Sequence, residues 1–237
     1  MRHWFTTTHW SVVMLARPDS PQAREALEKL CQTYWLPLYS CVRRQGYGPH
    51  DAQDLTQGFF VRLLRTDSLG SVSREKGKFR TFLQVALSHF LSDERDKARA
   101  EKRGGGRAIV SLDESEAEDR YLHMPSADLT PERVYDRRWA LTVLELGFER
   151  LRQEYRATGR EALFDSLKEF LCTEARVGTY ESLGPKLGMS PGSVAVAVHR
   201  LRQRCRELIR LEVAQTVSNP GDLDMEIDYL FAAIGGQ

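Results

Sequence analysis

Cysteine pairs and long apolar runs are absent from this chain, and their absence excludes several classes of protein. No two of its four cysteines have the C-x-x-C spacing of a zinc or redox site. Cys31, Cys41, Cys172 and Cys205 each fall within an apolar stripe, so we expect buried, reduced thiols, as is usual in a reducing cytoplasm. No run approaches the roughly 20 apolar residues of a membrane span, and residues 12–16 are too short for the apolar core of a signal peptide. The sequence therefore predicts a cytoplasmic protein that does not enter a membrane.

Catalytic motifs are also missing. The six histidines are scattered, no Ser-His-Asp set is indicated, and no pair of carboxylates lies in an apolar cleft pattern. The glycines at residues 104–106 follow no predicted strand and precede no Walker Lys-Ser/Thr, so they predict a flexible break rather than a phosphate cradle. We therefore expect no enzyme, no cofactor and no metal site, and a protein that works by binding.

The net charge of +1 conceals blocks of opposite sign. Residues 95–107 hold six Lys or Arg against two acids, and residues 200–210 hold five Arg against one Glu. Residues 113–119, in contrast, hold five acids and no base. Such blocks are typical of a protein that binds a polyanion and carries an acidic linker, although a solvated face explains any single block equally well.

Residues 179–211 predict two helices around a tight turn at residues 188–190. Ser190 can cap the second helix, and Pro191 suits its first position. The second helix carries an apolar stripe at spacings of three and four, formed by Val194, Val198, Leu201, Cys205 and Leu208. This is the outline of a helix-turn-helix, whose second helix commonly enters the major groove of DNA. A basic helical hairpin that contacts no DNA is the alternative.

Residues 49–64 predict a helix with one apolar face and one mixed face. The apolar face is formed by Ala52, Leu55, Phe59 and Leu63. The opposite side carries Gln53, Asp54, Gln57, Phe60, Val61 and Leu64. A helix of this kind either packs on both faces or presents a partner site, and periodicity leaves both open.

A second amphipathic helix follows a basic loop at residues 68–78. Its core stripe is formed without a gap by Phe79, Phe82, Leu83, Ala86, Leu87, Phe90 and Leu91, whereas Arg80 and Gln84 fall on the exposed side. A basic loop that leads into aromatic residues suits single-stranded nucleic acid, because cations follow the phosphates and rings can stack on bases. Burial of Phe79 and Phe82 in the core is the alternative.

Three stretches in this order resemble the sigma-70 family of RNA polymerase sigma factors. DAQDLTQGFFVRLL resembles the helix that binds core polymerase, and FRTFLQVALSHFLSDERDKARA resembles the helix that melts and reads the minus-10 element. TYESLGPKLGMSPGSVAVAVHRLR resembles the helix-turn-helix that reads the minus-35 element. Their order and separation are similar to those of the two-domain extracytoplasmic-function (ECF) sigma factors, over residues 21–103 and 136–215.

The resemblance implies three sets of site residues. Contact with the clamp helices of the polymerase beta-prime subunit is implied for Gln53, Asp54, Gln57, Phe60 and Val61. Contact with minus-10 DNA, whose displaced strand has one base flipped into the basic loop, is implied for Lys76, Lys78, Arg80, Gln84, His89, Asp93 and Arg95. Contact with the minus-35 duplex is implied for Ser193, Val196, His199, Arg200, Arg202 and Arg206.

Two places depart from the family pattern. The start of the recognition helix reads Ala195-Val196-Ala197, where the family commonly has basic or polar residues, so bidentate base readout is missing there. Val196 can contact a thymine methyl, and the arginines that follow are better suited to phosphates, which position a protein without specifying sequence. Pro185 falls inside the first helix of the pair and, with Gly184, should shorten or bend it.

The sequence thus predicts an all-α fold of two small helical domains. We expect a lead helix in residues 1–20, a region 2-like domain at 21–106, an acidic linker at 107–130, a region 4-like domain at 131–216 and an acidic amphipathic tail at 217–237. Pro37 should kink or split the helix that ends near Arg44. The tail either packs on a domain or covers the basic recognition surface and inhibits the free protein, in which case deleting residues 219–237 raises promoter binding.

Three functions remain open at this stage. The first is a sigma factor that binds core polymerase and directs minus-10 melting and transcription initiation. The second is a helix-turn-helix regulator that binds duplex DNA without polymerase. The third is a sigma-like protein that acts through protein contacts, which the run at residues 195–197 keeps open. The expected partners are core polymerase and promoter DNA, with an anti-sigma factor or self-inhibition by the tail as alternatives for regulation.

Overall fold

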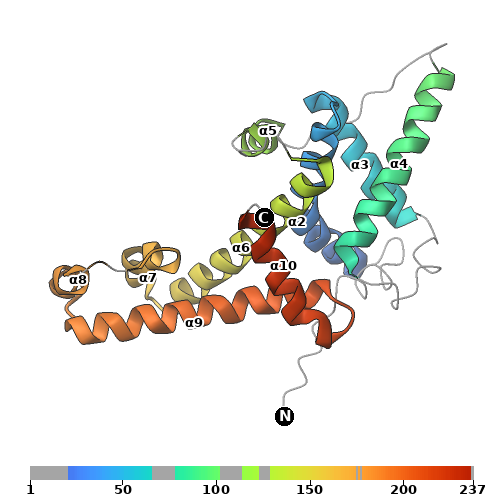
Figure 1. The fold of residues 1–237 in the computed structure, drawn as a ribbon. Coiled ribbons are helices and arrows are strands. Elements are labelled where there is room, and N and C mark those ends of the chain that lie inside the picture. Colours follow the sequence, from blue (N-terminus) through green and yellow to red (C-terminus); the bar gives the residue numbers. More distant parts are fainter. Residues whose placement is uncertain are drawn as a thin grey trace. The chain divides into compact units, whose positions relative to one another are not determined.

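The computed structural model describes residues 21–65, 78–101, 114–122, 129–174, 176 and 178–235. Within these ranges every regular element is a helix, as the sequence predicted (Figure 1). None of the described helices is long and apolar enough to cross a membrane. The lead helix predicted in residues 1–20 lies outside the described residues.

The chain divides into two compact units. The first comprises Met1–Thr142 and Ala214–Gln237, and the second comprises Val143–Val213. The border runs through two long helices, α6 (Pro131–Ala157) and α9 (Pro191–Thr216), rather than through a loop. The functional domain limits expected from the sequence stay a prediction.

The first unit is built around α2 (Pro21–Arg44), α3 (Pro49–Arg65) and α4 (Phe79–Glu101), which Figure 1 shows beside the first half of α6. Their apolar stripes meet in an aromatic core. Phe59 of α3 packs edge-to-face on Phe90 of α4, with ring centroids 5.8 Å apart. Tyr34 of α2 packs in the same way on Phe79, at 5.3 Å. The core stripe predicted for α4 is therefore confirmed for Phe79, Leu83, Leu87, Phe90 and Leu91, whereas Phe82 and Ala86 are partly buried.

Helix α2 continues through Pro37, so the split predicted there does not occur. Proline removes one backbone hydrogen bond and crowds the preceding turn, which costs about 3 kcal/mol in a helix interior. The residues on both sides of it, Tyr34 and Leu38, are fully buried. Tertiary packing of these side chains outweighs the local preference of proline.

A short helix, α5 (Glu114–Leu122), forms within the segment that was expected to be a linker. Its Glu118 carboxylate accepts hydrogen bonds from Arg43 Nη2 at 2.6 Å and Nε at 2.8 Å, and from the Tyr39 hydroxyl at 2.6 Å. The Arg43 guanidinium also lies over the ring of Tyr121 and holds the pKa of the Glu118 carboxyl below its usual range. Part of the acidic block is thus bound to the first unit rather than solvated.

The helix predicted in the tail is present as α10 (Leu223–Gly235), which follows a 3-10 turn, η4 (Pro220–Asp222). It belongs to the first unit, where Leu230 and Glu226 are its buried residues. The tail therefore packs on a domain, and the packing brings a carboxylate into that domain.

The second unit consists of the rest of α6, α7 (Glu161–Leu167), η3 (Lys168–Leu171), α8 (Thr179–Leu187) and most of α9. All five residues of the predicted α9 stripe are buried, from Val194 to Leu208. Helix α8 is nine residues long and contains Pro185, in agreement with the short first helix expected.

The four cysteines are free thiols, but they do not share one environment. Cys41 and Cys205 are buried, and burial raises the pKa of their thiols to about 12 and about 11, respectively. Cys31 is partly buried. The prediction of burial is wrong for Cys172, which is exposed because η3 ends at Leu171 and the chain leaves the core there.

Candidate functional site

The face of α3 that was predicted to bind a partner has a buried half and an exposed half. Gln53 and Phe60 are buried, and the Phe60 ring stacks on Trp35 with centroids 5.9 Å apart and an interplanar angle of 16°. Asp54 and Val61 are exposed and Gln57 is partly exposed. Packing on both faces therefore accounts for Gln53 and Phe60. The surface that remains for a partner is a row of Asp54, Gln57 and Val61 at spacings of three and four.

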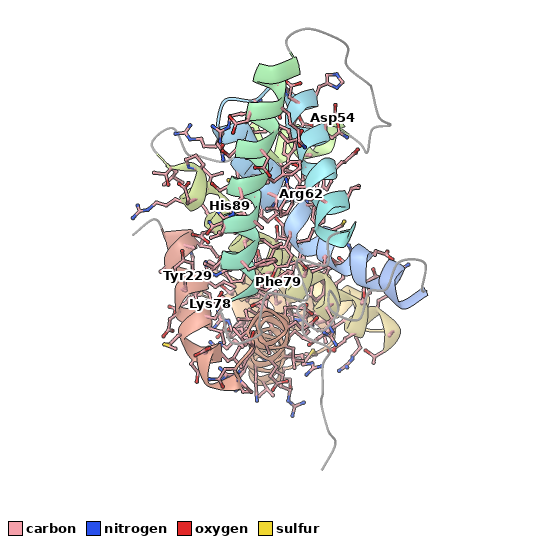
Figure 2. The ribbon with its side chains drawn as sticks, turned by 90° about the vertical axis from the view of Figure 1, so that its right-hand side faces the viewer. Asp54, Arg62, Lys78, Phe79, His89 and Tyr229 are labelled. Atoms are coloured by element: carbon pink, nitrogen blue, oxygen red, sulfur yellow. The ribbon has the colours of Figure 1, made fainter. Side chains whose placement is uncertain are left out.

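Next to the last residue of this row, Arg62 of α3 forms an ion pair with Asp93 of α4. Arg62 Nη1 of α3 lies 2.6 Å from Asp93 Oδ2 of α4, and both side chains are about half exposed. Figure 2 shows Asp54 and Arg62 along α3 and His89 on the neighbouring α4. Exposed pairs of this kind contribute only about 0–1 kcal/mol. Asp93 can therefore exchange Arg62 for another partner at little cost.

The start of α4 presents a different environment, because its arginine is not on the surface. Arg80 is 5% exposed, although the helical pattern placed it on the solvent side. Its Nε donates to Glu226 Oε1 of α10 at 2.5 Å, and its Nη1 donates to Asp136 Oδ1 of α6 at 2.8 Å. Lys78 Nζ lies 2.5 Å from the second Glu226 oxygen.

Aromatic groups complete this arrangement, which we call the Arg80 cluster: Lys78, Arg80, Asp136, Glu226 and Tyr229. The guanidinium carbon of Arg80 lies 3.9 Å from the centroid of the Tyr229 ring, and the Tyr229 hydroxyl donates to Asp136 Oδ2 at 2.6 Å. Figure 2 shows Lys78 and Tyr229 side by side at the foot of α4. All five residues belong to the first unit.

The electrostatics of the cluster follow from burial and pairing. Burial is the largest single influence and would lower the pKa of Arg80, but the hydrogen bond to Glu226 and the charges of Glu226 and Asp136 together outweigh it, so the pKa is raised. Burial raises the pKa of the Asp136 carboxyl above its usual range, although Tyr229 and Arg80 both donate hydrogen bonds to it. Both carboxylates are buried and therefore depend on nearby cations: Asp136 on Arg80, and Glu226 on Arg80 and Lys78.

The remaining minus-10 candidates lie further along α4 or outside the described residues. Lys76 is outside them. Gln84 is partly buried, and its Nε2 donates to the Glu132 carbonyl at 3.2 Å. His89 and Arg95 are exposed, and Arg95 Nε donates to the Leu91 carbonyl one turn back at 3.1 Å. Among the members of this set that the structure describes, the exposed Lys or Arg is therefore Arg95, whereas Lys78 is partly buried and Arg80 is buried.

The helix-turn-helix is built by glycine and serine. Gly188 adopts φ +62° at the end of α8, and the Met189 amide donates to the Gly184 carbonyl at 2.9 Å. The Ser190 hydroxyl accepts from the Ser193 amide at 3.2 Å, so the predicted cap of α9 is confirmed. These local bonds fix the direction in which α9 leaves the turn.

The outer face of α9 carries most of the minus-35 candidates. Its exposed members are Ser193, Val196, His199, Arg200 and Arg206. Val196 is 50% exposed, which leaves an apolar contact surface where a base reader was missing from the sequence. Arg202 differs from the others, because its Nε donates to the Phe170 carbonyl at 2.7 Å and its Nη2 to the Thr173 carbonyl at 2.8 Å. It ties α9 to the end of η3.

Truncation of Arg200 and truncation of Arg202 should have different effects on stability and on DNA binding. Arg202→Ala should lower the stability of the second unit by about 1–2 kcal/mol, because two carbonyls lose a charged donor. Arg200→Ala should leave stability unchanged. It should make the slope of log K for duplex binding against log salt concentration shallower by about 0.9, because one phosphate contact is lost. Urea denaturation followed by circular dichroism and DNA titrations at several salt concentrations separate the two. Equal effects of both variants on the salt dependence would contradict this assignment.

Sequence reasoning missed Glu226, Asp136 and Tyr229. A signal for Glu226 was present, because it lies on the same face of α10 as Leu223 and Leu230. A carboxylate at a core position of an amphipathic helix is seldom buried without a cation. That cation could not be named from the pattern. In the described part of the chain, no three His, Cys, Asp or Glu side chains are placed to hold a metal ion.

Comparison with known proteins supports the resemblance on which the candidate residues rest. No family model matches the chain, and no solved structure matches it. Among curated proteins it is similar to the ECF RNA polymerase sigma factor SigE of Mycolicibacterium smegmatis, with 26% identity over 198 residues. The alignment covers 83% of this chain and 66% of the relative, so the chain spans just under two thirds of that protein's length. The predicted resemblance to ECF sigma factors is confirmed as a distant relationship.

Proposed function

We propose that this protein is an ECF-type sigma factor that binds core RNA polymerase and directs it to promoter DNA. The observation that carries the proposal is the extent of the similarity to an ECF sigma factor. The similarity extends over 198 residues, or 83% of this chain, so most of the matched residues lie outside the helix-turn-helix at residues 179–211. A regulator that shares only a helix-turn-helix would match only near residues 179–211.

In this function the chain acts by binding and positioning, and the polymerase performs the chemistry in the cytoplasm. The exposed row of Asp54, Gln57 and Val61 contacts the clamp helices of the beta-prime subunit. Helix α4 and the loop before it hold the displaced promoter strand. The outer face of α9 lies against the minus-35 duplex, where Arg200 and Arg206 hold phosphates and Val196 contacts a base edge. Phosphate contacts fix register, whereas base contacts supply specificity.

The test is transcription with purified components. The protein is added to core polymerase, and run-off transcripts are collected from a pool of genomic promoters. Transcripts support the proposal. Duplex binding without transcripts supports a regulator that acts without polymerase, and core binding without transcripts supports a sigma-like protein that acts through protein contacts.

A charge reversal sharpens the test for the α3 surface. Asp54→Arg should weaken binding to core polymerase at least about tenfold, which corresponds to about 1.4 kcal/mol. Glu149→Arg is the matched control, because Glu149 is also an exposed acid but lies on α6 in the second unit. Affinity for core is measured by fluorescence anisotropy of the labelled full chain. An unchanged affinity of the Asp54 variant would move the polymerase contact away from α3.

A further inference from the structure

Helix α10 places two groups against the start of α4 at a spacing of three residues. Glu226 is fully buried, and its two carboxylate oxygens meet Arg80 Nε and Lys78 Nζ, each at 2.5 Å. Tyr229 follows one turn later and lies over the guanidinium of Arg80 at 3.9 Å. One helix thus supplies an anion and an aromatic ring to the same pair of cations.

These two groups resemble the two parts of one nucleotide in their chemistry, an anion like the phosphate and a flat aromatic ring like the base. A phosphate bridges an arginine and a lysine as the Glu226 carboxylate does, because both anions accept hydrogen bonds from nitrogen donors through separate oxygens. Proteins that bind single strands stack bases on aromatic rings and on the plane of arginine, and here the Tyr229 ring covers that plane. The contacts therefore match the chemistry of a single-stranded ligand.

Most apolar side chains of α10 are only partly buried or are exposed. Leu230 is its one fully buried apolar side chain among the described residues, whereas Met225 is 58% exposed and Phe231 is 55% exposed. A helix held by a broad apolar face would resist displacement, because each buried large side chain contributes through the hydrophobic effect. Helix α10 is attached through Leu230, through partly buried residues such as Ile227 and Ile234, and through the Arg80 cluster, and a polyanion competes directly for the cations of that cluster.

We propose that α10 is an inhibitory helix whose Glu226 and Tyr229 imitate a nucleotide and compete with single-stranded DNA for Lys78 and Arg80. The inference rests on the proposed function only in taking the start of α4 as the site for the promoter strand. In the free protein the helix occupies that site. Binding of the strand displaces the helix, and a base takes the place of the Tyr229 ring.

The first experiment measures binding of a fluorescein-labelled single-stranded DNA oligonucleotide to the full chain. Glu226→Gln keeps the shape of the side chain and removes its charge, so it should bind the oligonucleotide at least about tenfold more tightly than the unaltered protein. Asp228→Asn is the matched control, since it removes the same charge from an exposed position of α10 and should change affinity less than about twofold.

The second experiment uses the unaltered chain, so it does not depend on the folding of a variant. Hydrogen exchange of the amides of residues 223–235 is followed with and without the oligonucleotide. Faster exchange in the presence of DNA supports displacement of α10. Equal affinities of the Glu226 variant and the unaltered protein, or α10 amides that stay protected when DNA binds, would overturn the proposal, as would a failure of every form to bind the oligonucleotide.

Failure of this inference is distinguishable from failure of the proposed function. If the protein supports run-off transcription while the α10 amides stay protected, the proposed function is supported and the inhibitory role of α10 is refuted. If the protein yields no transcripts but Glu226→Gln raises its affinity for single-stranded DNA, the inhibitory role of α10 is supported and the proposed function with polymerase is refuted.

Discussion

Arg80→Ala should lower the free energy of unfolding of the first unit by about 3–5 kcal/mol, because it leaves the buried Asp136 carboxylate without its cation and leaves Glu226 paired with Lys78 alone. Glu226 is fully buried and Asp136 is nearly so, and Arg80 donates to both. The effect is measured by urea denaturation with tryptophan fluorescence. Trp35 and Trp139, the two tryptophans in the described part of the chain, both lie in the first unit and report on it.

Two further variants decide whether burial is the cause. Lys97→Ala breaks an ion pair of similar length, 2.6 Å to Glu94, on the exposed surface of the same helix. That change should cost less than about 0.5 kcal/mol. Arg80→Ala combined with Glu226→Leu should regain part of the lost stability, because it removes a buried carboxylate that has lost one of its two cations. Equal losses from Arg80→Ala and Lys97→Ala would contradict the assignment.

The position of Arg80 shows what periodicity resolves and what it does not. The stripe of Phe79, Leu83 and Leu87 follows from spacing alone, because an apolar face must be buried wherever the helix packs. Arg80 falls outside that stripe, yet it is buried by a partner 146 residues away in the sequence. The residue pattern within one helix carries no information about a partner so distant in the sequence. The sequence therefore could not show which residues outside the apolar stripe of α4 are exposed and which are buried by another helix.

The same limit applies to the α3 surface. The mixed face predicted either a second packing surface or a partner site, and the structure contains both on one helix. Phe60 packs on Trp35 of α2, whereas Asp54 remains exposed. Which of the two a residue serves depends on where α2 crosses α3. The helix-turn-helix, in contrast, was predictable almost in full, because its turn is specified by neighbouring residues: Gly188 at positive φ and Ser190 as cap.

Gly184→Ala should destabilise the second unit by about 3 kcal/mol, toward the upper end of the usual cost of overpacking. A Cβ at this position would lie 2.6 Å from the Met189 carbonyl oxygen, closer than such atoms approach in proteins. The obstacle is backbone, and it cannot turn aside as a side chain would, because the Met189 amide is hydrogen-bonded to the Gly184 carbonyl at 2.9 Å. The turn must therefore open, which displaces the start of α9 and weakens duplex binding.

Gly192→Ala is the control for this prediction. Gly192 also lies in a helix, but apart from its chain neighbours and the backbone of its own helix no atom falls within 4 Å of a Cβ built there. Alanine should stabilise α9 by about 0.5–1 kcal/mol, since glycine loses more backbone freedom on folding. For both variants, the stability of α9 is measured by hydrogen exchange of the amides of residues 191–213, and DNA binding is measured as affinity for duplex DNA. If Gly184→Ala protects α9 as well as Gly192→Ala does, the close approach of Met189 is not what requires glycine in α8. Neither Gly184 nor Gly192 has the positive φ that Gly188 adopts. If Gly184→Ala lowers stability and Gly192→Ala raises it, lack of space for a side chain, rather than backbone conformation, is what requires glycine at residue 184.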